Sequence, residues 1–85
     1  MNPTQSVVMT GGPAVAVWPR LSDDPKHIPK FVAAVLPEGE KVTVVNVHSK
    51  LMRGFKNWAE VRYRDQGREH TGFIALMYLD KLDTL

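Results

Sequence analysis

The chain has 85 residues, of which 44% are hydrophobic and 24% are charged, with no cysteine and a net charge of +2. This length leaves room for one domain and excludes two independent hydrophobic cores. Without cysteine the chain has no disulfide scaffold, thiolate metal site or cysteine nucleophile, so packing alone must hold the domain together. The small net charge does not select a class of partner.

The N-terminal segment lacks the basic start and the apolar run of a signal peptide. Gly11, Gly12 and Pro13 break the chain, so we expect residues 1–13 to be an N-terminal extension and residues 14–85 to form the domain. Residues 7–9 could add a short edge strand. The longest apolar stretch, residues 31–36, is far below the ~20 residues that cross a bilayer. These features predict a cytoplasmic protein with no membrane span.

Apolar and polar residues alternate with a period of two, which predicts β-strands, and no stretch shows sustained helical periodicity. The residues concerned are β-branched or aromatic, the types that suit a pleated and half-buried surface. The alternating apolar positions are Val15, Val17, Val42, Val44, Ala59, Val61 and Tyr63, and a further short run is Phe73-Ile74-Ala75.

Two turns and two long connections are expected between these strands. Residues 37–40 predict a tight turn and residues 64–68 a hairpin with a three-residue loop, each with a glycine able to take positive φ. Residues 19–30 contain three prolines and predict a long irregular loop. A second long connection is expected from about residue 48 to 57. The natural assembly is a small β-barrel with both long loops on one side.

From residue 15 onward the chain resembles the Src-homology-3 (SH3) family, most closely its bacterial variety. Residues 36–45 are similar to the diverging turn and following strand of that family, and residues 58–63 to its central strand. Residues 71–79 are similar to its closing strand, short helical turn and final strand. The resemblance covers roughly residues 14–82. It implies an all-β, SH3-like barrel of five to six short, mostly antiparallel strands with a short helical turn before the last one.

The resemblance also implies a core and a binding groove. Trp58 and Tyr78 would lie on the groove where relatives bind proline-rich peptides, and Trp18 would lie in or near the loop beside it. We expect these three residues to be aromatic anchors for a partner. Asp23 and Asp24 would occupy an acidic loop that meets a basic residue of the ligand. The implied core residues are Val42, Val44, Val61, Ile74 and Leu79. The first-strand aromatic pair of the family is here Val17-Trp18-Pro19, and Ala75 replaces a frequent proline, so two groove walls differ.

Trp58 lies by alternation on the strand face opposite to Ala59 and Val61. It is either an outward-facing binding anchor or a residue partly buried under residues 48–57. Arg62 and Arg64 share its face, and we expect them to make electrostatic contacts with a partner. A secondary contact patch, Leu51, Met52, Arg53, Phe55 and Lys56, either folds back as a lid or stays exposed and allows self-association.

The charges are unevenly distributed. Residues 50–68 hold six cations and two carboxylates, +4, which leaves −2 for the rest of the chain. A basic patch beside an aromatic residue is typical of a surface that binds nucleic acid or an acidic partner. The sequence therefore keeps a nucleic-acid-binding barrel as an alternative function, and a cell-wall or glycan-binding module as a further one.

No catalytic or metal-binding pattern is present in the sequence. His27, His48 and His70 do not have the spacing of a metal site, and no serine, carboxylate pair or glycine-rich loop has a catalytic context. We expect a non-enzymatic protein with no cofactor and no metal. The leading prediction is a protein–protein or peptide binding module of adaptor or inhibitor type, whose affinity comes from aromatic burial and whose orientation comes from charge.

Overall fold

The computed structural model describes residues 4–8 and 13–81 of the chain. Within them it places seven strands and one short 3-10 helix: β1 Thr4–Val8, β2 Ala14–Val17, β3 Ala34–Pro37, β4 Lys41–Met52, β5 Phe55–Asp65, β6 Arg68–Ala75, η1 Leu76–Tyr78 and β7 Leu79–Lys81. The predicted all-β class is confirmed, including the helical turn directly before the last strand. The described residues hold seven strands rather than the expected five to six.

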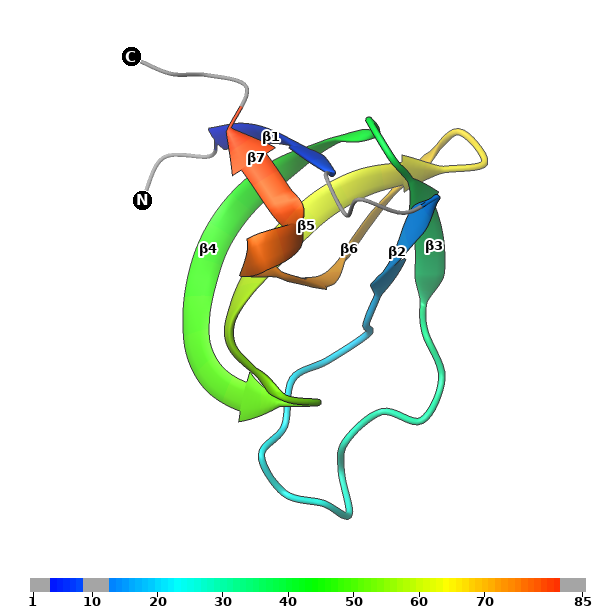
Figure 1. The fold of residues 1–85 in the computed structure, drawn as a ribbon. Helices are drawn as coiled ribbons and strands as arrows, with labels where there is room; N and C mark the ends of the chain where they lie inside the picture. The colour runs from blue at the N-terminus through cyan, green and yellow to red at the C-terminus, as the bar shows by residue number, and fades with distance from the viewer. Residues whose placement is uncertain (1–3, 9–12, 82–85) are drawn as a thin grey trace.

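The strands form two antiparallel sheets, shown in Figure 1. The larger sheet has the order β6-β5-β4-β1-β7, and the smaller sheet pairs β2 with β3. The sheets meet at a bridge between Trp18 and Phe73, where the N–H of each residue donates to the carbonyl oxygen of the other at 2.8 Å. This bridge joins the first long loop to β6 and so fixes one side of the site described below.

The strand β1 is an internal member of the larger sheet. It pairs with β4 on one side and with β7 on the other, so residues 4–8 of the expected N-terminal extension form a strand of the sheet. The expected edge strand at residues 7–9 overlaps β1 only at Val7 and Val8, and Met9 lies outside the described residues.

The long strand β4 is strongly curved in Figure 1. Its pairing with β5 is irregular between Val44 and Asn46 and again between Ser49 and Met52. Such irregularities bend a strand and increase its twist. The curvature carries the tip of the β4–β5 hairpin to the side where the loop between β2 and β3 lies, so that the two segments can enclose a site.

The expected long connection over residues 48–57 is wrong. The strands β4 and β5 continue to a two-residue turn at Arg53 and Gly54, whose φ values are 52° and 85°. Two left-handed residues match the twist of the flanking strands and close a hairpin in the smallest number of residues. The strands were not recognised because most side chains of this segment are charged or polar. Such side chains are tolerated here since both strand ends lie partly on the surface.

The other two turns keep their predicted positions. Gly39 has a φ of 87°, and the Glu40 N–H donates to the Pro37 carbonyl oxygen at 3.1 Å. The β5–β6 turn has two central residues rather than the expected three, Gln66 and Gly67, with φ values of 54° and 77°. Asp65 and Arg68 are therefore paired directly across the hairpin.

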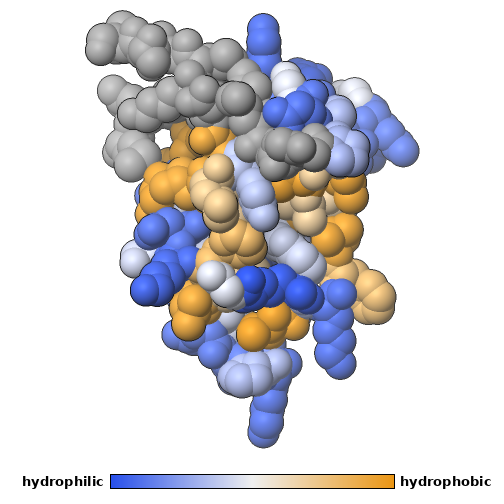
Figure 2. Space-filling model, viewed as in Figure 1, coloured by the Kyte–Doolittle hydropathy of each residue, from blue (hydrophilic) through white to orange (hydrophobic). Residues whose placement is uncertain are grey.

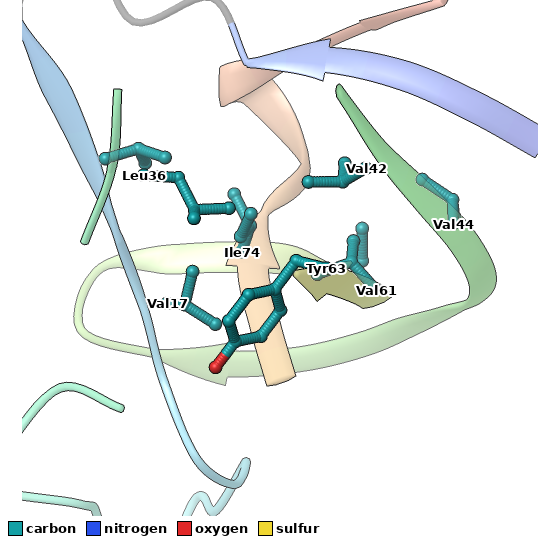
Figure 3. Packing of buried hydrophobic residues seen from close by; sticks show 9 residues of the cluster. Val17, Leu36, Val42, Val44, Val61, Tyr63 and Ile74 are labelled. Atoms are coloured by element: carbon teal, nitrogen blue, oxygen red, sulfur yellow. The ribbon is translucent and has the colours of Figure 1, made fainter. Parts of the chain in front are cut away.

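The main core lies between the two sheets (Figure 3). The predicted core residues Val42, Val44, Val61 and Ile74 are buried, and Leu79 packs against them while half-buried. The remaining buried members of this cluster are Val15, Val17, Leu36, Ala59 and Tyr63. Burial of these side chains is the main stabilising contribution, at about 1.5–3 kcal/mol for each large aliphatic residue.

Gly72 allows the sheets to approach each other next to the Trp18–Phe73 bridge. A Cβ atom at this position would overlap Cγ1 of Val17 and would lie 3.2 Å from the Trp18 carbonyl oxygen. It would also lie 3.4 Å from Cε1 of Tyr63. A side chain of any size would therefore push β2 away from β6, and glycine is needed for the close contact of the two sheets.

The loop between β2 and β3 forms a second cluster with the opposite face of β5. Trp58, Met52 and Ala75 are buried in it, and Leu21 and Ile28 of the loop pack against them. Residues 19–33 contain no strand or helix, so the predicted irregular loop is confirmed. Among the described residues no helix reaches the length and apolarity needed to cross a membrane.

Candidate functional site

A groove of about 470 Å³ opens where the second cluster reaches the surface. The predicted aromatic anchors Trp18, Trp58 and Tyr78 all contribute to its lining. The other lining residues are Ala14, Val15, Ala16, Arg53, Phe55 and Ala75. Figure 2 shows hydrophobic surface across the middle of the molecule, with hydrophilic side chains at its upper right and at its lower end.

Three separate segments of the chain bring the four aromatic rings together. Trp18 follows β2, Phe55 and Trp58 belong to β5, and Tyr78 ends the helical turn η1. Phe55 is the central ring, because it meets Trp58 edge-on at 5.8 Å and Tyr78 at 5.5 Å between ring centres. Edge-to-face pairs of this kind contribute about 0.5–1.5 kcal/mol beyond area burial, so the rings hold one another in place.

Trp58 is the buried floor of the groove and not an outward-facing anchor. Its side chain is among the largest fully buried ones, at 1% exposure. The indole Nε1–H donates to the Phe55 carbonyl oxygen at 3.2 Å, so its polar atom is already paired. The prediction from alternation placed Trp58 on the correct face of β5, but the loop between β2 and β3 covers that face. Trp18, Phe55 and Tyr78 are half-buried, so part of each side chain is exposed in the groove.

Arg53 supplies the charge of the groove. Its guanidinium carbon lies 4.0 Å from the centre of the Trp18 ring, and Nη2 donates to the Pro29 carbonyl oxygen at 3.2 Å. A cation over an indole face is favourable by about 0.5–1 kcal/mol at exposed sites. Arg53 thereby connects the tip of the β4–β5 hairpin to the loop between β2 and β3.

The secondary contact patch does not stay together in the structure. Met52 is buried beneath the groove, whereas Leu51 is 59% exposed, because neighbouring strand residues point to opposite faces. Phe55 and Arg53 line the groove instead. Lys56 lines a separate shallow hollow beside Met77, which is exposed.

Arg62 and Arg64 do not line the groove, which corrects the expected grouping with Trp58. They line a different hollow of about 210 Å³ that also holds Glu40 and Glu69. Arg62 is four residues along β5 from Trp58, roughly 13 Å at the usual strand rise. Its Nε atom is buried and makes no hydrogen bond within the described part of the chain. The cations of residues 50–68 are therefore spread over several surfaces.

Asp23 and Asp24 are exposed and line neither the groove nor the hollow formed by Arg20, Lys26 and Lys30. The Asp24 carboxylate accepts the Lys26 N–H at 3.0 Å and contacts Nδ1 of His27 at 2.8 Å. The backbone hydrogen bond from Lys26 and then the His27 contact lower the pKa of Asp24 below its ordinary value of 3.8. The Asp24 carboxylate therefore stabilises the turn at residues 24–27 of the loop.

A further hollow of about 320 Å³, the loop hollow, lies on the loop between β2 and β3 and is basic. Arg20, Lys26 and Lys30 line it together with Pro19, Ile28, Pro29 and Phe31. Phe31 is 81% exposed. Because Pro19 follows Trp18 in the chain and Pro29 accepts a hydrogen bond from Arg53, this loop hollow lies next to the groove.

Other titratable groups stabilise the sheet. His48 contacts Glu60 at 3.0 Å and meets the Phe73 ring edge-on. Burial, and then the nearby charge of Asp65, raises the pKa of Tyr63 above its ordinary value of 10.0. In the described ranges 4–8 and 13–81, no group of three or more histidine, aspartate or glutamate residues is arranged to hold a metal ion.

Comparison with protein-family models, curated proteins and solved structures finds no significant match. The chemistry of the site therefore rests on its own geometry. The sequence predicted three of the groove residues as anchors, and it placed Phe55 and Arg53 in a separate patch. Gly54 is the local turn signal at this hairpin, but the polar residues before it give no strand alternation that would have placed Arg53 and Phe55 correctly.

Proposed function

We propose that this chain is a non-catalytic module that binds an extended segment of a protein partner in the aromatic groove. The observation that supports it is the convergence of three half-buried rings, Trp18, Phe55 and Tyr78, over a buried tryptophan floor. A ligand that covers these rings gains apolar burial, and large aromatic side chains commonly dominate such interfaces.

The groove suits an extended ligand because its walls are formed in advance. Trp18 is fixed by the backbone bridge to Phe73, and Phe55 is packed between Trp58 and Tyr78. Binding then requires little ordering of the protein. A polyproline-type or extended peptide also loses little conformational entropy when it docks between flat rings. The proposed SH3-like character of the chain, in its bacterial form, agrees with this location.

The alternatives predicted from the sequence are tested as outcomes of the same experiment. The cations of residues 50–68 were expected to form one basic surface for nucleic acid. Instead, Arg53 lies on the Trp18 ring. Arg62 and Arg64 lie in another hollow beside Glu40 and Glu69. This distribution favours the groove over a continuous phosphate-binding surface. Glycan binding has no separate structural observation in its favour.

The test begins with a display library of random peptides selected on the immobilised protein. Affinities of selected peptides are then measured for the wild-type chain and for Trp18→Ala, Tyr78→Ala and Val35→Ala. Val35 is the control, because it is an exposed apolar residue that lines neither the groove nor the loop hollow. We expect the two groove variants to weaken binding by roughly tenfold or more and the control to bind as wild type.

The proposal is overturned if the library yields no specific peptide, or if Val35→Ala abolishes binding while both groove variants bind normally. A fluorescent single-stranded oligothymidine and purified cell-wall material are measured in parallel. Tight, steeply salt-dependent binding of the oligonucleotide without peptide binding would instead support the nucleic-acid function. Sedimentation with wall material alone would support the glycan function.

A further inference from the structure

Arg53 is the charged residue of the groove. Of the nine lining residues the other eight are apolar or aromatic. An apolar groove with a single cation at its edge favours a ligand whose apolar side chains fill it and whose negative charge reaches that cation. The ligand charge favoured by Arg53 is therefore opposite to the one expected from Asp23 and Asp24, which would favour a basic ligand.

The backbone of Arg53 is held in an uncommon conformation. Its φ of 52° places it in the left-handed region, where asparagine and glycine are the usual residues of such a turn. An arginine at this position costs backbone energy that asparagine would avoid. Residues in sparsely populated conformations concentrate at functional sites, and this conformation directs the Arg53 side chain to the Trp18 ring.

The guanidinium is held from two sides and keeps donors for a ligand. One face lies over Trp18 at 4.0 Å, and Nη2 donates to the Pro29 carbonyl oxygen at 3.2 Å. A guanidinium has five N–H donors in a rigid plane. Donors beyond the one directed at Pro29 can bind a carboxylate, and the stacked and bonded plane is already oriented for it.

The loop hollow next to Arg53 extends the positive surface. Its charged lining residues are Arg20, Lys26 and Lys30, and no carboxylate belongs to its lining. The Asp24 carboxylate contacts His27 and the Lys26 backbone N–H. A peptide ligand that continues beyond Arg53 therefore meets the three cations of the loop hollow. A ligand that ends at Arg53 would not contact them.

We infer that the groove selects an extended peptide segment whose apolar residues cover the rings and whose following acidic side chains bind Arg53 and then the loop hollow. This inference rests on the proposed function and names the chemistry of its ligand. Specificity comes from Arg53, because a basic ligand would face a fixed guanidinium at the groove edge, and like charges at such a position are disfavoured.

Peptides from the display library first test the inference by their composition. We expect an apolar segment next to aspartate or glutamate. A selected peptide and its Asp/Glu→Asn/Gln version are then titrated against the wild-type protein, Arg53→Asn, Arg53→Lys and Arg53→Glu. Arg53→Asn keeps a residue that accepts the left-handed turn and removes the charge. Lys50→Glu is the matched control, since it changes the charge of the same hairpin outside the groove lining.

We expect Arg53→Asn to weaken the acidic peptide by roughly tenfold to a hundredfold and to affect its amide version little. Arg53→Lys should bind at an intermediate level, because lysine keeps the charge without the planar fork. Thermal unfolding of each variant confirms that it is folded. If the selected peptides lose their binding when the C-terminal carboxylate is amidated, Arg53 binds that carboxylate. This result would overturn the inference that Arg53 binds acidic side chains.

The failure of this inference is distinguishable from the failure of the proposed function. Peptides that are apolar or basic, and that bind wild type and Arg53→Asn equally while Trp18→Ala weakens them, would overturn the role of Arg53 and leave the groove function in place. No specific peptide from the library would overturn both. Equal loss of binding in Lys50→Glu and Arg53→Glu would show a nonspecific charge effect and would also overturn the inference.

Discussion

Replacement of Gly72 by alanine tests the contact that joins the two sheets. The glycine has no left-handed φ, so the effect of Gly72→Ala comes from space rather than from backbone strain. The new methyl would overlap Cγ1 of Val17 and would lie tightly against the Trp18 carbonyl oxygen at 3.2 Å. Val17 is fully buried and stiff at χ1, so it has little freedom to yield.

The expected magnitude follows from two opposing contributions. Overpacking of a well-filled core costs about 1–3 kcal/mol, and the smaller entropy of the unfolded alanine chain returns about 0.4–1 kcal/mol. The net loss of unfolding free energy is about 1–2 kcal/mol, which lowers the melting temperature of a domain of this size by about 4–16 °C. The change in unfolding free energy is measured by urea denaturation monitored by circular dichroism.

A double-mutant cycle identifies the cause. Val17→Ala alone removes buried methyl groups and costs about 1–3 kcal/mol, but in the Gly72→Ala background it also removes the overlap. The double variant should therefore be more stable than the sum of the single changes predicts, by about 1 kcal/mol or more. The control pair is Val17→Ala with Gly67→Ala, because a Cβ at Gly67 meets nothing within 4 Å.

Additive behaviour of the Gly72 pair, within about 0.3–0.5 kcal/mol, would refute the steric explanation. Wild-type stability of Gly72→Ala would refute the close approach of β2 and β6 itself. The same variant also reports on the groove, since Trp18 is bridged to Phe73 directly after this glycine. A shifted Trp18 should weaken peptide binding even at temperatures where the variant is fully folded.

Three further predictions concern the floor, the core and the hairpin. Trp58→Ala should lose about 3–5 kcal/mol of unfolding free energy and Trp58→Phe clearly less; near-wild-type urea unfolding of Trp58→Ala would mean that the side chain is not buried. Tyr63 should ionise above pH 10.0 in an absorbance titration, and Asp65→Asn should lower its pKa only in part, because burial is the larger cause. Since the unfolded phenol ionises first, stability should fall as the pH rises above 10.0, and ionisation at or below that pH would contradict the buried position. Arg53→Asn should melt close to wild type and Arg53→Val distinctly lower, because β-branched residues fit poorly at positive φ; the reverse order would refute the assigned turn.

Much of the fold was predictable from local patterns. The alternation around Val42 and Val61 predicted these strands and their core face, because a strand exposes every second residue to the same side. Gly39 and Gly67 marked turns, since glycine takes positive φ without steric cost. The prolines of residues 19–30 predicted a loop, because proline cannot donate to a strand ladder.

The errors arose where the outcome depends on distant residues. The hairpin at Arg53 looked like a loop, because Ser49 and Lys50 are polar and the strand periodicity fades there. Trp58 was assigned to the correct face of β5, but alternation cannot tell whether a face meets water or another segment. The nine buried residues of the main core left that second face open, and Leu21 and Ile28 from a remote loop cover it.

By itself the sequence determined one small all-β domain without cysteine, most of its strands and two of its turns. These properties follow from length, composition and the period of two, which act over a few neighbouring residues. The tertiary structure decided the rest. It made Trp58 a floor, moved Arg62 and Arg64 away from it and set Arg53 on Trp18. Such relations depend on the curvature of β4 and on how the loop packs, and these are set by contacts between residues far apart in the chain.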